Sequence, residues 1–470
     1  MRTLDRARAR GPNQRQRRPD HSVWGGLRWT ARAARVFVAL LLCALSPSVA
    51  RATPQDLYGL GGRSPGLGMT GVSFVCDWEA VYLNPANLAG TRNRRLAFSA
   101  NASVYDLHVD HERYPLEAAR GTTIGFQLPL PFGDVLEDRL VLGGGFYTPT
   151  NVLLRGDVRY ADVPQFSVLN RAQSIAIQVG LGFDFHDIID GLRIGIGISA
   201  LANVYGDLLV RLDESSAFVS TVETQLLTVF SPIAGATFTQ PEWGVGVVYR
   251  HEVRAELNLN IVVRDLPVPL PIVTVAGIIQ YDPAQLAIEG FWLPDPNVRI
   301  IVNATARFWS FYPGAARPTT MNSFLAPAPG YSDTVSPRLA IEGTLHDGSV
   351  TAQLRLGYAL ELSPVPVARM AAERNANGTP HLDAGGDPIL TANRSLDHDR
   401  HVITAGFGFD HAFSEHQHII FDLYGQLHAG IDRLHPIYRD MDMNAPLDVG
   451  VGMVSGGMIF VGGWTLAAEF

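Results

Sequence analysis

Apolar side chains recur at every second position over many short segments of this chain. Between residues 174 and 185 one face carries Ile175, Ile177, Val179, Leu181, Phe183 and Phe185, and the other carries Ser174, Ala176, Gln178, Gly180, Gly182 and Asp184. A period of two is that of a β-strand, in which successive side chains point to opposite sides. After residue 52 there is no run of about 18 apolar residues, the least that crosses a membrane as a helix. The pattern therefore predicts an all-β protein.

Fourteen segments with this alternation can be placed along the chain. They cover residues 95–105, 122–130, 139–149, 173–185, 192–205, 241–250, 253–263, 284–293, 298–311, 336–346, 349–362, 400–411, 418–431 and 457–470. Six short connections alternate with seven long ones, and both ends of the series lie on the side of the short connections. Outer-membrane barrels have this arrangement, with short periplasmic turns and long external loops. We predict a transmembrane antiparallel β-barrel of about 14 strands over residues 94–470.

Two features of this interpretation stay open. The polar face of each strand looks into the lumen of a barrel but into water in a secreted soluble sandwich, so the alternation itself fits both. The long connection 206–240 is apolar enough, with Phe218, Leu226 and Phe230, to fold over the mouth or to form two further strands, which gives sixteen. The final residues Trp464 to Phe470 alternate to an aromatic end, which resembles the carboxy-terminal signal of outer-membrane barrels.

The first 52 residues have the features of an export signal. They contain 11 Arg and 2 acidic residues, an apolar run from Val36 to Leu45, and the sequence Ala50-Arg51-Ala52. A basic region, a short apolar run and an A-x-A site are typical of a cleavable signal peptide. We assign residues 1–52 to this signal, and its long basic region points to a later true start.

The composition after residue 52 excludes several classes of function. The remaining chain has 26 Arg, no Lys and 43 acidic residues, which gives a net charge of −17. Nucleic-acid binding requires a basic surface, so we expect no nucleic-acid partner. Cys76 is the single cysteine left, so no disulfide forms within the chain.

Between the signal and the first predicted strand lies a segment of a different character. Residues Leu57 to Gly90 contain seven Gly and two Pro, and Asn84-Pro85-Ala86 is a strong turn signal. The segment also carries apolar residues that favour burial, namely Phe74, Val75, Trp78, Val81, Tyr82 and Leu83. Irregular backbone with many apolar side chains is typical of a compact plug enclosed by a larger structure, here the predicted barrel. We therefore predict an N-terminal hatch over residues 53–93.

The same residues resemble a known family. Gly61-Gly62-Arg63-Ser64-Pro65-Gly66-Leu67-Gly68-Met69, followed by Val81-Tyr82-Leu83-Asn84-Pro85-Ala86-Asn87-Leu88, is similar to the hatch of FadL-type outer-membrane transporters. Residues 174–199, residues 243–260 and the final strand add to the resemblance, which covers most of 53–470. It implies hatch contacts from Gly61, Gly62, Arg63, Ser64, Gly66, Gly68, Met69, Asn84, Pro85, Ala86 and Leu88. Cys76-Asp77-Trp78-Glu79 is bulkier than the family's usual run at this point.

The resemblance also implies a lateral opening in the third strand. In that family a kink in this strand opens a gap in the wall, which here would lie at Gly143, Gly144 and Gly145, with Phe146 after it. Glycine within a strand marks a bulge, a bend or a close approach. The alternative is that these glycines only relieve crowding against the hatch.

Enzymatic and metal sites have little support in the sequence. The last quarter is rich in histidine, with His398, His401, His411, His416, His418, His428 and His435. A metal site needs three or four convergent ligands, and the predicted strands distribute these histidines among turn, lumen and loops. Ser414-Glu415-His416 lies in a short turn without a supporting motif. We expect no enzyme activity, no metal and no cofactor.

The function that follows is passive, hatch-gated uptake of hydrophobic small molecules such as long-chain fatty acids or aromatic hydrocarbons. The expected location is the outer membrane of a Gram-negative cell, with membrane lipid around a monomeric barrel. The alternative is a FadL-like barrel that serves as a structural or docking component of an envelope assembly. A general porin is a further alternative, which the hatch argues against.

Overall fold

The computed structural model describes most of the chain after the predicted signal. The described residues are 54–132, 139–150, 164–166, 175–212, 218–264, 273–314, 324–325, 327–366, 370–375, 377–392, 394–414, 417–436 and 452–470. The predicted signal peptide lies outside them. Within them no helix combines the length and the apolar character needed to cross a membrane.

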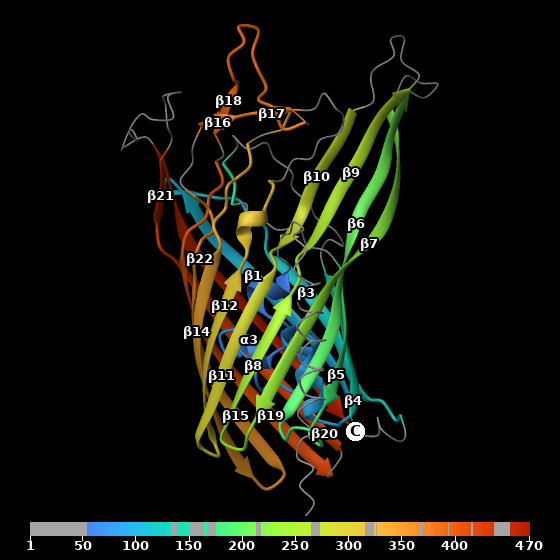
Figure 1. Cartoon of the computed structure of the whole chain (residues 1–470), viewed down its shortest axis with the longest axis vertical. Coiled ribbons are helices and arrows are strands. Elements are labelled where there is room, and N and C mark those ends of the chain that lie inside the picture. The colour runs from blue at the N-terminus through green and yellow to red at the C-terminus, as the bar shows by residue number, and fades with distance from the viewer. Residues whose placement is uncertain are drawn as a thin grey trace, which may run out of the picture. The chain divides into compact units, whose positions relative to one another are not determined.

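Fourteen of the described strands pair antiparallel in a closed ring, which we call the wall (Figure 1). They are β1 (Arg95–Val109), β3 (Ala119–Pro129), β4 (Leu140–Pro149), β5 (Ala176–Asp184), β6 (Leu192–Leu212), β7 (Phe218–Thr239), β8 (Trp243–Arg250), β11 (Gln285–Asp295), β12 (Val298–Arg307), β14 (Thr334–Asp347), β15 (Val350–Glu361), β19 (Arg400–Ser414), β20 (Gln417–Gly430) and β22 (Gly452–Glu469). The ring closes where β1 pairs with β22, from Arg95 opposite Glu469 to Val109 opposite Ser455. Closure leaves the wall without an unpaired edge at this seam.

The predicted count of fourteen strands is confirmed, but two of the assignments were wrong. Strand β7 lies in the segment that we assigned to a long loop, and it pairs with β6 and β8. The predicted wall strand 253–263 instead forms β9 (Val253–Arg264), which pairs with β10 (Val273–Asp282) and runs parallel to β6. The wall strand that we missed, β7, and the segment that we wrongly placed in the wall, 253–263, offset each other, so the total of fourteen is unchanged.

Strands β9 and β10 leave the wall because the hairpin that contains them is bent. Their neighbours β8 and β11 pair in the wall up to Arg250 opposite Gln285. Beyond that point β9 crosses to the far edge of β6, where Val204 to Arg211 pair with residues 257–264. The strands β10, β9, β6 and β7 thus form a sheet that rises beyond the end of β5 (Figure 1).

The remaining elements are short. They are α2 (Pro54–Tyr58), α3 (Arg63–Gly66), α4 (Ala80–Leu83), the 3₁₀ helices η1 (Pro85–Gly90) and η3 (Trp309–Phe311), and the strands β2 (Glu112–Arg113), β13 (Phe324–Leu325), β16 (Met370–Ala372), β17 (Arg374–Asn375), β18 (Leu390–Ala392) and β21 (Arg433–Pro436). We call the end of the barrel that carries β16, β17, β18 and β21 the loop end, and the end with the C-terminus the turn end (Figure 1).

The outer face of the wall is apolar. Every wall strand contributes at least one exposed large apolar side chain, for example Leu96, Ile124, Phe146, Ile177, Ile196, Phe230, Val247, Ile288, Val302, Leu339, Leu356, Ile403, Leu423 and Leu466. The inward positions are instead buried and mostly polar or small, such as Ser99, Gln127 and Gln178. An apolar exterior with a polar interior is the reverse of a soluble domain and is typical of a membrane barrel.

Glycines occupy many inward positions of the wall, and they touch the segment that precedes β1. A Cβ added at Gly195 would lie 2.1 Å from the backbone nitrogen of Ala86, and one at Gly357 would lie 2.2 Å from that of Gly68. Glycines with the same role are Gly125 against Trp78, Gly143 against Leu88, Gly182 against Ala89, Gly235 against Asn84 and Gly246 against Val72. These distances are shorter than real Cβ contacts. At Gly182, Gly195, Gly246 and Gly357 the opposing atom belongs to the backbone, so the wall needs glycine there.

This packing predicts a strong effect of one methyl group. We expect Gly195→Ala to destabilise the barrel by about 3 kcal/mol, the upper end of the usual cost of overpacking, because backbone rather than a side chain must move. The measurement is the temperature at which the folded band is lost in heat-modifiability electrophoresis. Gly343→Ala is the matched control, since a Cβ there meets nothing within 4 Å. Equal midpoints for the two variants would contradict the packing.

Candidate functional site

The lumen contains residues 54–91, which we call the inner segment. Its backbone is irregular, with short helical turns joined by glycines in the left-handed region, such as Gly59 (φ 84°) and Gly61 (φ 78°). The turn at Asn84 starts η1, because the Asn84 side chain accepts a hydrogen bond from the amide of Ala86 and Pro85 occupies the first helical position. Nearly all of its side chains from Tyr58 to Ala89 are buried.

Glu289 of β11 holds the middle of the inner segment. Its buried carboxylate accepts hydrogen bonds from the amides of Gly71 (2.9 Å) and Ser73 (2.8 Å), and from the Ser73 hydroxyl (2.7 Å). Asn303 of β12 adds a fourth donor at 2.9 Å. Backbone amides that have no strand or helix partner need such acceptors, since an unpaired buried amide costs about 1–3 kcal/mol.

Arg63 joins the inner segment to a charged network on the wall. Its guanidinium donates to both carboxylate oxygens of Glu342, at 3.0 and 2.7 Å. Glu342 also accepts from Arg299 (2.6 Å) and Arg355 (3.1 Å), and Arg355 in turn pairs with Asp422. Bidentate arginine–carboxylate pairs are among the stronger and more directional polar contacts, so Arg63 is held in both position and orientation.

Glu79 connects two parts of the inner segment to each other. It accepts hydrogen bonds from the consecutive amides of Gly62 (2.7 Å), Arg63 (2.9 Å) and Ser64 (3.0 Å). Burial raises the pKa of Glu79 to about 8, the charge of Asp77 adds to this rise, and the amides of Ser64 and Arg63 oppose it. Glu79 is therefore a protonation site inside the fold, within the pH range of ordinary experiments.

The other residues singled out by the family resemblance also contact the wall. Gly66 packs on Gly406, its carbonyl accepts from Thr404, and the amide of Gly68 donates to Thr404 at 2.8 Å. The carbonyl of Met69 accepts from Arg338 at 3.0 Å. The side-chain amide of Asn84 donates to the backbone carbonyls of Val72 (2.8 Å) and Ala236 (3.3 Å). Pro85 and Ala86 pack on Gly195.

The first residues of the inner segment are held differently. Tyr58 is hydrogen-bonded to the wall through both its side chain and its backbone. Its hydroxyl pairs with that of Tyr105 at 2.7 Å, and its carbonyl accepts from Gln426 at 3.1 Å. We call residues 54–60 the leading residues. From Gly62 onward, by contrast, the segment is tied to the wall at many points.

Leu57 and Tyr58 pack in an apolar cluster toward the loop end, which we call the loop-side cluster. Its buried members are Tyr58, Tyr105, Leu107, Ala119, Phe166, Leu396, Tyr424, Ile459 and Val461, and Leu57, Val109, Tyr114, Leu116 and Met453 pack against them. Phe166 and Leu396 come from long external connections, whereas most of the others come from wall strands. The cluster is thus the place where loops, wall and leading residues meet.

The three glycines of the third wall strand do not interrupt the sheet. Gly143, Gly144 and Gly145 pair with both β3 and β5 without a shift in register. A Cβ at Gly143 would meet Leu88 at 2.5 Å, and one at Gly144 would meet Phe126 at 2.3 Å. Crowding against the inner segment therefore accounts for Gly143, and the ladder is closed at the position where we expected a gap. Phe146 lies on the outer face, opposite Ile177.

Four of the described histidines have separate hydrogen-bond partners. His401 pairs with Tyr358, His418 with Asp410, His428 with Gln426 and His435 with Ser455. Burial lowers the pKa of His398 to about 4, so this side chain is neutral at physiological pH. No group of three or more metal-ligating side chains is gathered within the described residues. Glu415 and His416, of the turn noted above, lie outside them.

Comparisons with known proteins agree with this geometry. No family model matches the sequence, and no curated protein is significantly similar to it. A FadL homologue of Pseudomonas aeruginosa has a similar structure, with 14% identity and a TM-score of 0.54, over 90% of this chain and 99% of that one. The chain has the FadL-type fold.

Two further solved structures align over similar lengths. The CymD monoaromatic hydrocarbon channel has 14% identity and a TM-score of 0.46, over 89% of this chain and 99% of that one. The P. putida toluene transporter TodX has 12% identity and a TM-score of 0.46, over 88% and 99%. The FadL-type fold, the closed ring of 14 strands and the apolar exterior make this chain a β-barrel of the Gram-negative outer membrane.

Sequence reasoning missed the wall residues that hold the inner segment. Glu289, Glu342, Gln426 and Thr404 were not singled out, although Glu289, Glu342 and Gln426 are inward polar residues of alternating strands. The sequence signal that could have identified such a residue is a carboxylate on the polar face of a strand, where the other residues of that face are small. Alternation marks such a residue as inward, but it does not show whether the side chain contacts water or the inner segment.

Glu79 gives a prediction for pH. Because its folded-state pKa is raised, folding binds a proton, and the stability this contributes is present below the unfolded value near 4.3 and lost as pH rises through about 8. We expect the thermal unfolding midpoint of the barrel to fall between pH 5 and 9, and Glu79→Gln to flatten this dependence. Glu223→Gln, at an exposed position, is the control. An unchanged pH profile in Glu79→Gln would refute the assignment.

Proposed function

We propose that this barrel takes up hydrophobic small molecules, such as long-chain fatty acids or aromatic hydrocarbons, across the outer membrane as a monomer, and that the inner segment is its hatch. The observation that carries the proposal is the uneven attachment of this segment. Residues from Gly62 onward are tied to the wall by Glu289, Glu342 and Thr404, whereas the leading residues depend on Tyr58 and on apolar packing. The segment therefore has a fixed body and a displaceable leading end.

An apolar ligand can replace the leading residues in the loop-side cluster. Leaving the cluster costs roughly 1.5–3 kcal/mol for each large apolar side chain, and about 1 kcal/mol for each hydrogen bond of Tyr58. Burial of a chain of about 16 carbons, at about 0.8 kcal/mol for each CH₂, contributes on the order of 10 kcal/mol before entropy losses. The free energy gained by burying the ligand is larger than the free energy lost by the leading residues. Binding at this cluster would therefore displace Leu57 and Tyr58, and their displacement would signal that cargo is bound.

Release needs a route past the fixed body of the hatch. We propose that cargo leaves sideways beside Gly143, through a transient opening between β4 and β5. On the inner face of this seam Gly143 lies opposite Gly180, and Gly145 opposite Gln178. Cross-strand side-chain pairs contribute much of the stability of a sheet, and the pair Gly143–Gly180 has no side chains to contribute it.

Deletion of the leading residues tests the hatch. We expect removal of residues 54–60 to lower saturable uptake of a fluorescent fatty acid or an aromatic tracer by about tenfold, the effect of roughly 1.4 kcal/mol. The barrel should still insert and keep its heat-modifiable band, because the body of the hatch keeps its anchors. Deletion of residues 377–387, most of which are exposed, is the matched control.

Unchanged uptake after that deletion would contradict the gating role. One feature favours the alternative of a docking component, namely that β7 pairs with β8 only from Ile233 to Thr239, so its earlier residues have one edge without a described partner strand. Such an edge can accept a strand from another protein. Copurification of a stoichiometric partner, together with unchanged uptake, would replace transport by docking.

A disulfide across the seam tests the exit. Phe146 and Ile177 are opposite each other on the outer face, at a spacing that cysteines can bridge. In a Cys76→Ser background we expect oxidised Phe146→Cys/Ile177→Cys to lose uptake and to recover it on reduction. The pair Val247→Cys/Ile288→Cys, in another seam, should leave uptake unchanged. Full uptake with the first pair locked would exclude this exit while leaving the hatch untouched.

A further inference from the structure

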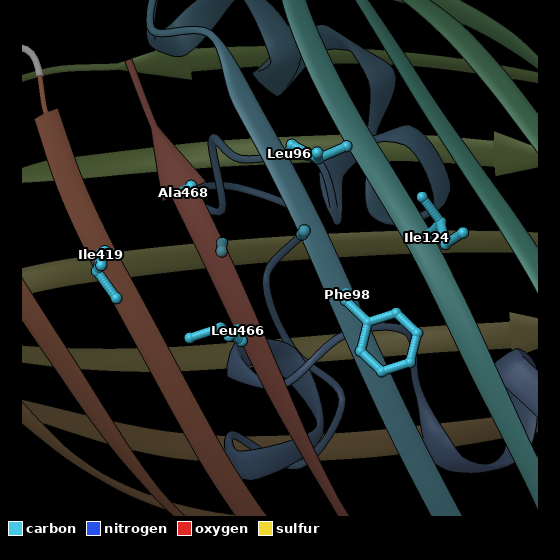
Figure 2. A pocket seen from close by; sticks show the side chains of 8 residues that line it. Leu96, Phe98, Ile124, Ile419, Leu466 and Ala468 are labelled. Carbon is cyan, nitrogen blue, oxygen red and sulfur yellow. The ribbon is translucent and has the colours of Figure 1, made fainter.

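The outer face of the wall carries a groove at the turn end, where the first and last strands meet. Its volume is about 370 Å³, and Figure 2 shows six of its lining side chains, which are Leu96, Phe98, Ile124, Ile419, Leu466 and Ala468. They come from β1, β3, β20 and β22 and are apolar without exception. The groove is therefore formed by strands from both ends of the chain.

Strand register explains why the surface is hollow at this point. Ala468 lies between Leu96 on β1 and Ile419 on β20, and in the next row Phe98 lies opposite Leu466. A methyl group between two large side chains leaves a notch about one side chain wide. Leu96 is 54% exposed and Ile419 is 43% exposed, so the walls of the notch face the membrane.

An apolar notch in lipid does not select its occupant by itself. Hydrocarbon surrounds the barrel, so there is no hydrophobic gain when a chain moves from the bilayer into the notch, and only packing contributes. Selectivity must come from a polar group at the membrane surface beside the groove.

Arg94 supplies that group. Its backbone carbonyl accepts from the amide of Phe470 at 2.9 Å, which places Arg94 one row below the pair Leu96–Ala468. By the period of two its side chain shares the outer face with Leu96, and it is exposed.

Neighbouring arginines are already paired, and Arg94 differs from them. Arg95 binds Glu469 and lies 3.4 Å from Asp77, while Arg92 lies 3.9 Å from Asp184. Within the part of the chain that the structure describes, no ion pair involves Arg94. A guanidinium at the end of a membrane strand is well suited to a lipid phosphate, which it binds in a bidentate fashion.

We propose that this groove binds one anionic phospholipid of the periplasmic leaflet, with an acyl chain between Leu96 and Ile419 over Ala468 and the phosphate on Arg94. The turn end faces the periplasm in barrels of this kind, so the adjoining leaflet is the inner one. The notch lies where β22 pairs with β1 and β20, whereas the proposed exit lies between β4 and β5.

Native mass spectrometry of the full barrel tests the proposal. The protein is equilibrated with equal amounts of phosphatidylglycerol and phosphatidylcholine, and retained lipid is counted. We expect wild type to prefer phosphatidylglycerol, and Arg94→Gln to lower that preference about fivefold, the factor that one basic residue near an anionic surface provides. Arg92→Gln, which alters a paired arginine of the same stretch, should keep it.

The acyl-chain part is tested by filling the groove. Ala468→Phe should lower retention of both lipids, whereas Ala304→Phe, at an exposed alanine of β12, should not. If Ala468→Phe fails to fold, Ile419→Ala removes one wall of the groove and should also lower retention. A preference unchanged in Arg94→Gln, equal losses in the two phenylalanine variants, or a dimer that Ala468→Phe dissociates would each overturn the proposal.

Discussion

The lumen of this barrel is organised by glutamate side chains whose oxygens accept hydrogen bonds from irregular backbone. A segment without regular secondary structure carries many amides that strands and helices would otherwise satisfy, and water is excluded around it. Glu289 from the wall and Glu79 from the segment itself take up five of these amides between them. Without such acceptors these amides would be buried and unpaired, at a cost of about 1–3 kcal/mol each.

Strand number and fold class were accessible from the sequence, because apolar residues on the outer face impose a period of two. The pattern failed at β7, where inward Ile233 packs on Val72 of the inner segment and Pro232 and Gly235 weaken the strand signal. It also failed at β9, whose alternation is as regular as that of a wall strand. Periodicity reports which face of a strand is apolar, and it does not report which strand is its neighbour.

Glycine and proline drew attention to the inner segment in the sequence, but its partners on the wall were not found. Asn84 and Gly68 stand out in the sequence because a turn and a positive φ require such residues. Thr404 and Gln426 occur among many polar residues that alternate in the same way, and only the fold brings them to the inner segment. Sequence reasoning left two explanations of Gly143 open, because glycine in a strand has the same appearance whether it bends the strand or makes room for a side chain such as Leu88.

The inward glycines have a consequence for how such a barrel can vary. The wall and the inner segment are in contact through backbone at Gly195, Gly246 and Gly357, so neither surface can gain a side chain unless the opposite surface recedes. Outward positions are free of this condition and need only remain apolar. A substitution at one of these wall glycines therefore requires a matching change in the inner segment, which lies far away in the sequence. Residues on the lipid face can change one at a time.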